Sequence, residues 1–183
     1  MMDIILAVEK IADIKEYCKT DDIFAIYDKL GIPYLKRDLG SPRDGLKGFS
    51  TYYDYHFCSV INQRLPRFIQ ILVAYHELGH IILDPELLMS GTCLFDYNIG
   101  GSINAAERRA NLFAAEGLID DKKLLNMLHS GYTLQSAASA LKVPEEFVAY
   151  KVKILRQYDE PLPYVDMPDS RCLGEDILGG ENF

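Results

Sequence analysis

Residues 66–85 read PRFIQILVAYHELGHIILDP, and the rest of the fold is best understood from this stretch outward. Its apolar residues recur at spacings of three, four and seven from Ile69 to Leu83, which is the periodicity of a helix that buries one face. The periodicity begins after Pro66, and Pro85 stops it because proline cannot continue a helix. The sequence therefore predicts one amphipathic helix between the two prolines.

The segment HELGH at residues 76–80 lies within this predicted helix. His76 and His80 are one turn apart on the same face, so both imidazoles can reach one tetrahedral zinc ion. Glu77 is offset by one residue and can instead accept a proton from an attacking water. Two core histidines without a metal are the alternative, but each buried imidazole would then need its own hydrogen-bond partner. The pattern predicts a Zn²⁺ site and zinc-dependent hydrolysis of a peptide bond, with Glu77 as general base.

A catalytic zinc site takes a third protein ligand and leaves its fourth position to water, and two carboxylates compete for that place. Asp84 follows His80 by four residues, but the helix is ending there and the short side chain would have to reach back along its axis. Glu107 opens a second predicted helix of small residues that can pack closely on the first, so it is the better candidate. Glu107 can equally close a capping box with Asn104 as the N-cap residue. From the residues alone, ligand and cap remain equal interpretations of Glu107.

The remaining sequence predicts an α+β fold that is mainly helical. Residues 3–30 show two helical recurrences closed by Gly31. Residues 33–35 and 49–60 are rich in aromatic and β-branched residues, with three glycines between the two stretches, which predicts a small antiparallel sheet. Residues 122–158 predict three short helices in the manner of a helix-turn-helix, with a break at Val143-Pro144.

Charge and composition divide the predicted fold into three parts. Residues 1–121 form the predicted zincin-like core. Residues 122–158 form the helix-turn-helix-like segment, which we expect to pack on the core and which carries six basic and two acidic side chains. Residues 159–183 carry one basic and seven acidic side chains among prolines and glycines, which predicts a loosely ordered tail.

The whole chain has a net charge of −8 and shows no sequence feature of membrane insertion or export. No run of about 18 apolar residues occurs, and the N-terminus lacks a basic start followed by a cleavable apolar stretch. The four cysteines form no C-x-x-C pair, which suits reduced thiols in a cytosol. We therefore expect a cytoplasmic protein.

Together with HELGH, residues 107–115, which read ERRANLFAA, resemble the ImmA/IrrE family of metallopeptidases and its E-x-x-A-N-x-F-A-A motif. The resemblance extends over about residues 20–155. It implies that Glu107 is the third zinc ligand and that Asp84 is not. It further implies a cytosolic metallo-endopeptidase that acts on helix-turn-helix repressors of phages and mobile elements.

Two other functions are compatible with the sequence. The first is a DNA-binding regulator that uses residues 122–158 as its helix-turn-helix, with the local positive charge on phosphates. Against it, the whole chain is acidic and the stretch that would read DNA starts with Glu145 and Glu146. The second is a protein that captures a repressor without proteolysis, which leaves the intact HELGH segment without a role.

Overall fold

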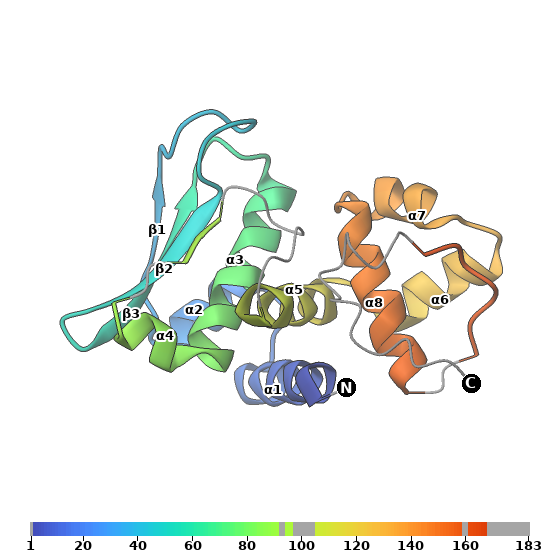
Figure 1. The fold of residues 1–183 in the computed structure, drawn as a ribbon, viewed down its shortest axis with the longest axis horizontal. Helices are drawn as coiled ribbons and strands as arrows, with labels where there is room; N and C mark the ends of the chain where they lie inside the picture. Colours follow the sequence, from blue (N-terminus) through green and yellow to red (C-terminus); the bar gives the residue numbers. More distant parts are fainter. Residues whose placement is uncertain (1, 92–93, 97–104, 159–160, 168–183) are drawn as a thin grey trace, which may run out of the picture.

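The structure, a computed structural model, describes residues 2–91, 94–96, 105–158 and 161–167 (Figure 1). Its helices, in chain order, are α1 (Met2–Cys18), α2 (Ile23–Leu30), α3 (Arg67–Leu83), α4 (Pro85–Met89), α5 (Ala105–Leu118), α6 (Asp121–His129), α7 (Leu134–Leu141) and α8 (Glu145–Gln157). Its strands are β1 (Tyr34–Arg37), β2 (Gly48–Tyr53), β3 (His56–Asn62) and β4 (Leu94–Asp96). The predicted α+β, mainly helical fold is confirmed.

The elements lie side by side along the long axis of the molecule. Figure 1 shows the sheet at one end, α3 against one face of the sheet, α5 in the middle and the helices α6 to α8 at the other end. Helix α1 runs beneath α5, and the two helices are in contact. The interface of α3 with α5 is the most extensive between any two described elements, and it brings the second half of the chain onto the HELGH helix.

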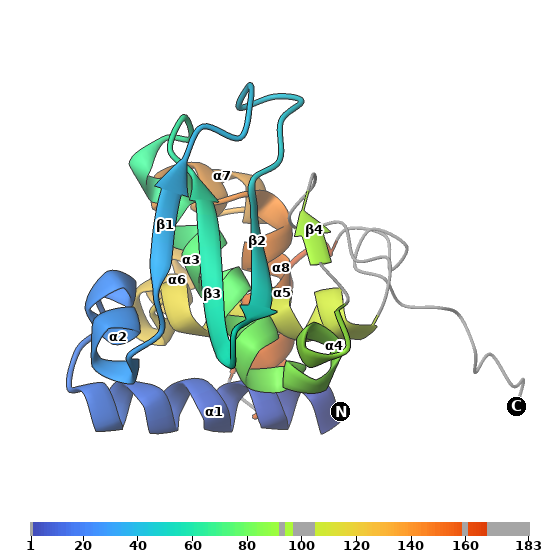
Figure 2. The same cartoon turned by 90° about the vertical axis from the view of Figure 1, so that its left-hand side faces the viewer.

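The sheet is mixed, so the prediction of an antiparallel sheet was wrong for one pairing. Its strand order is β1-β3-β2-β4, as Figure 2 shows face on. β2 pairs antiparallel with both β3 and β4, whereas β1 pairs parallel with β3. The chain leaves β1 by a long connection and enters β2, which lies two places from β1 in the sheet. The β2–β3 hairpin then places β3 between β1 and β2, where β3 runs antiparallel to β2 and parallel to β1.

A tight hairpin sets the register of β2 with β3. Its two turn residues, Asp54 and Tyr55, both have a left-handed backbone, with φ of 49° and 64°, and such a turn matches the twist of antiparallel strands. This turn places Ser50 directly opposite Ser59. Both serines are fully buried.

Helix α3 begins and ends where the prolines predict. Arg67 is its first residue after Pro66, and Asp84 caps its C-terminal end with its backbone N–H on the carbonyl of His80. Pro85 stops α3 and also starts the short helix α4, because proline is tolerated in the first turn of a helix. The sequence predicted the stop but not the new helix.

Gly79, inside HELGH, allows α3 and α5 to approach closely. A Cβ atom at this position would lie 3.0 Å from the Cα of Ala110 and 3.2 Å from the Cβ of Phe113. Ala110 and Phe113 are themselves fully buried. The small residues of α5 thus serve the close helix packing that the sequence predicted.

One hydrophobic cluster joins the two ends of the described chain. It includes buried residues from α1, α3 and α5 and continues through α6 and α7 to α8. The ammonium of Lys151, on α8, is buried between the carboxylates of Glu116 and Asp121. The hydrophobic core continues past residue 121 without a break, so the predicted domain boundary at this residue stays a prediction.

Part of the predicted acidic tail packs on the core. Val165 is 8% exposed and belongs to the hydrophobic cluster, and Leu162 and Met167 pack against it. Residues 168–183 lie outside the described residues, as does Asn104, the predicted N-cap. Among the helices that the structure describes, none combines the length and the apolar character needed to cross a bilayer.

Candidate metal centre

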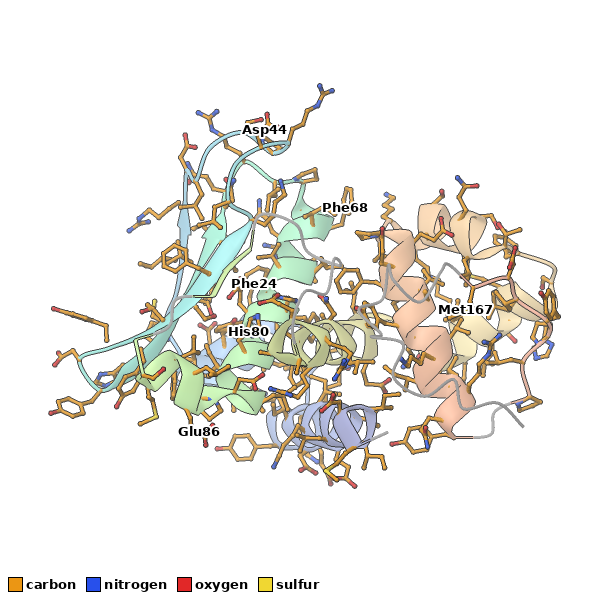
Figure 3. All side chains as sticks on the ribbon, viewed as in Figure 1. Phe24, Asp44, Phe68, His80, Glu86 and Met167 are labelled. Atoms are coloured by element: carbon orange, nitrogen blue, oxygen red, sulfur yellow. The ribbon has the colours of Figure 1, made fainter. Side chains whose placement is uncertain are left out.

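His76, His80 and Glu107 meet at one point, where the middle of α3 passes the start of α5. The Nε2 atoms of the two histidines are 3.0 Å apart. Each also lies near a carboxylate oxygen of Glu107, at 3.4 Å from His76 and 3.5 Å from His80. Figure 3 labels His80 at this crossing. The structure therefore brings together the three residues that the sequence proposed as ligands.

The spacing of these donor atoms fits a tetrahedral zinc ion. Zinc bonds of about 2.0–2.1 Å at tetrahedral angles separate neighbouring ligand atoms by about 3.3–3.4 Å. The distance between the two histidine nitrogens, and the distance from each to a different Glu107 oxygen (Oε2 for His76, Oε1 for His80), lie within a few tenths of an ångström of that value. Two imidazoles and one carboxylate are also the donor types of a catalytic zinc site with an open fourth position.

The cluster is buried, so charge interactions within it are stronger than they would be in water. Both imidazoles are fully buried, and the side chain of Glu107 is 15% exposed. Burial raises the pKa of Glu107, but its hydrogen bonds and charge interactions with the two histidines outweigh this and hold it well below the usual value. Glu107 is therefore a carboxylate, the form that binds a cation.

Glu77 is fully buried beside the cluster without being part of it. Its carboxylate is not among the converging donor atoms of the described residues. The Ser50 hydroxyl donates to Glu77 Oε2 at 2.7 Å. Close by, a Cβ atom at Gly48 would lie 3.0 Å from Glu77 Oε1. Strand β2 thus stands against the carboxylate predicted to be the general base.

Asp84, the rival third ligand, is held by another partner. Arg109 Nε lies 3.1 Å from its Oδ1 and 3.3 Å from its Oδ2, and Arg109 Nη2 also donates to Oδ1. The same guanidinium lies 3.7 Å from Asp3 on α1. These contacts, led by the hydrogen bond that Arg109 donates to Asp84, raise the pKa of Arg109 above its usual value. Asp84 closes an ion pair between the end of α3 and the start of α5.

An oxyanion would need a further hydrogen-bond donor, and two candidates for it among the described residues, Tyr75 and His129, lie elsewhere. The hydroxyl of Tyr75 donates to the carbonyl of Asp21, between α1 and α2, at 2.7 Å. His129 is exposed on α6, which lies at the end of the molecule away from the sheet (Figure 1). Tyr97 lies outside the described residues. Asn111, one turn after Glu107, is fully buried, and its side-chain atoms have no hydrogen-bond partner among the described residues.

Ser50 is the site residue that sequence reasoning missed. It occupies an inward position of β2, where the burial pattern alternates, and a single serine in a predicted strand carries no motif. A small polar residue on the buried face of a strand that is otherwise aromatic and β-branched was the available signal, because a buried hydroxyl needs a partner.

A family model described as the IrrE N-terminal-like domain, of the M78 peptidases, matches residues 27–153. The chain belongs to this family. The match begins in α2 and ends within α8, so the M78 domain includes the sheet, the metal-compatible cluster and the C-terminal helices. The resemblance to the ImmA/IrrE peptidases is confirmed, and with it the class of metallopeptidase. No curated protein and no solved structure shows significant similarity to the chain.

Proposed function

We propose that this chain is a zinc-dependent endopeptidase that cuts a specific protein substrate in the cytoplasm. The observation that carries the proposal is the convergence of His76, His80 and Glu107 at separations suited to zinc, with Glu77 buried beside them. A site that only bound metal would not need a carboxylate next to its ligands.

The residues divide the work as follows. His76, His80 and Glu107 would hold the ion. A bound zinc would polarise the scissile carbonyl and promote ionisation of the attacking water. Glu77 accepts the proton of that water on its carboxylate and passes it to the leaving amine. Burial of the ligand side chains keeps bulk water away and strengthens these charge interactions.

We propose a helix-turn-helix repressor of a phage or mobile element as the substrate. The support is the family, since the resemblance to ImmA/IrrE peptidases implies regulatory proteolysis of such repressors. The net charge of −8 also argues against a nucleic-acid substrate, because polyanions repel an acidic protein.

Direct DNA binding is the weaker alternative, and burial in α8 argues against it. In a helix-turn-helix made by α7 and α8, the second helix would enter the major groove. Here the residues of α8 from Phe147 to Val152, with Ile154 and Leu155, are all buried. Lys151, one of the basic side chains that suggested phosphate contacts, is engaged by two carboxylates. The apolar face of α8 therefore packs against α5.

The proposed function is tested by co-expression with a candidate helix-turn-helix repressor from the same genome. The wild-type chain should shorten the repressor to a defined product on a gel, whereas Glu77→Gln should leave it whole. A product of the same length with both chains would assign the cleavage to another protease. An intact repressor that co-purifies with both chains would favour capture without proteolysis.

A further inference from the structure

Three buried hydroxyls form a continuous chain that ends on the carboxylate of Glu77. The Oγ atoms of Ser50 and Ser59 are 3.0 Å apart, and Ser59 Oγ lies 2.9 Å from the hydroxyl of Tyr27. Tyr27 comes from α2, Ser59 from β3 and Ser50 from β2, so three elements converge on one residue of α3. All three side chains are fully buried.

The hydrogens of this chain can all point toward Glu77. Ser50 has one proton, and its shortest contact is with Glu77 Oε2, at 2.7 Å, against 3.1 Å to the backbone carbonyl of Glu77. Ser59 can then donate to Ser50. Burial raises the pKa of Tyr27 well above its usual value, so the phenol stays protonated and can donate to Ser59 or to the carbonyl of Ala74, 3.0 Å away.

Strand β2 limits the freedom of the carboxylate in a second way. A Cβ atom at Gly48 would lie 2.6 Å from Cγ1 of Val73 and 3.0 Å from Glu77 Oε1. The backbone of β2 therefore lies directly against one carboxylate oxygen, while Ser50, two residues along the same face, binds the other. A glutamate has three rotatable side-chain bonds, and contacts to both oxygens select one orientation.

We propose that Ser50 is a positioning residue for Glu77, through its direct hydrogen bond to Oε2. The role rests on the proposed function, since it concerns the orientation of the general base. Ser50 donates to Oε2 and turns the carboxylate so that it can meet the attacking water. A proton acceptor misplaced by about 1 Å can lose about 100-fold in rate, so one hydrogen bond that fixes its orientation has a large effect.

The alternative is that Ser50 only fills and stabilises the core, and a matched variant separates the two roles. Ser59→Ala removes the same hydroxyl from a residue that is equally buried and lies opposite Ser50, but whose Oγ lies against the hydroxyls of Ser50 and Tyr27. A purely structural role predicts similar effects of Ser50→Ala and Ser59→Ala. A positioning role predicts a much larger effect of Ser50→Ala on what Glu77 does.

The experiment measures zinc content and the affinity of a peptide hydroxamate for the wild-type chain, Ser50→Ala, Ser59→Ala, Glu77→Ala and the double variant Ser50→Ala/Glu77→Ala. A hydroxamate binds zinc and presents a hydroxyl to the neighbouring carboxylate, so its affinity reports the position of Glu77 without turnover. Ser50→Ala should keep its zinc and bind the hydroxamate about tenfold more weakly, as expected for a lost hydrogen bond to a charged group. Ser59→Ala should weaken it about twofold at most, and Ser50→Ala should add nothing once Glu77 is alanine.

Equal losses for the two serine variants, or the same loss from Ser50→Ala with and without Glu77, would overturn the proposal while leaving the peptidase intact. A wild-type chain without zinc would instead remove the proposed function, and the role of Ser50 would fall with it. Comparing denaturation midpoints of the zinc-free variants guards against a folding defect. Ser50→Ala should lower the denaturation midpoint more in the wild-type chain than in the Glu77→Ala variant. Equal shifts would mean that the hydrogen bond between Ser50 and Glu77 does not contribute.

Discussion

Asp84 accepts hydrogen bonds from Arg109 Nε at 3.1 and 3.3 Å, and this pair joins the C-terminal end of α3 to the first turns of α5. The contact fixes the helix that carries Glu107 against the helix that carries the two histidines. It also occupies the carboxylate that competed with Glu107 as a zinc ligand. The two acidic residues therefore have different roles: Asp84 holds the two helices together, and Glu107 faces the two histidines.

Glu107→Gln should remove most of the zinc affinity, because it replaces the anionic ligand by a weak amide oxygen. Asp84→Asn should retain zinc, since only the ion pair with Arg109 is weakened, at a cost to stability of about 1–3 kcal/mol because Asp84 is buried. Competition with a chromogenic chelator measures both affinities. Loss of zinc in Asp84→Asn with no loss in Glu107→Gln would move the third ligand to Asp84.

Glu77→Gln should keep the fold and the zinc but lose proteolysis by at least about 100-fold, because the amide is similar in shape and cannot accept a proton. Its oxygen can still accept from Ser50, so the denaturation midpoint should change little. Cleavage of the co-expressed repressor, followed by gel over time, gives the rate. Undiminished cleavage by this variant would show that Glu77 is not the general base.

Gly79→Ala should weaken zinc binding even though alanine favours a helix more than glycine does. The added methyl group would press on the backbone of Ala110, 3.0 Å away, and force α3 and α5 apart. Overpacking of this kind costs about 1–3 kcal/mol, and here it also separates the histidines from Glu107. Zinc affinity and the denaturation midpoint should fall together, and an unchanged zinc affinity would mean that the helix spacing does not control the site.

Two truncations should differ in stability but not in zinc content. Deleting residues 160–183 removes Val165, which is buried in the core, and should lower the free energy of unfolding by about 1–3 kcal/mol. Deleting residues 168–183 keeps Val165 and its neighbours and should cost much less. Urea denaturation measures the difference, and equal midpoints for the two truncations would mean that residues 160–167 add nothing to the core.

The sequence was most informative where local pattern decides the structure. The period of residues 66–85 and the spacing of His76 and His80 depend only on helix geometry, and the structure agrees with both. The parallel pairing of β1 with β3 depends on how a long connection crosses the sheet, which no local pattern encodes. Ser50 was missed for the same reason, because its partner on α3 is 27 residues away in the chain.

Glu107 shows where pattern reasoning stops. A capping role and a ligand role place the same residue type at the same helical position, so spacing cannot separate them. The structure places its carboxylate 3.4 and 3.5 Å from the two histidine nitrogens, a relationship that exists only once α3 and α5 have packed. Val165 gives a smaller example, since composition alone cannot show that one apolar residue of an acidic segment finds the core.

Elemental analysis of protein purified without added metal or chelator tests the zinc site most directly. We expect about one zinc per chain in the wild-type protein and in Glu77→Gln, since both keep the three ligands. Glu107→Gln should contain little zinc, and removing zinc from the wild-type protein with a chelator should lower its denaturation midpoint. A wild-type chain that holds no metal, and whose midpoint does not respond to added zinc, would contradict the account.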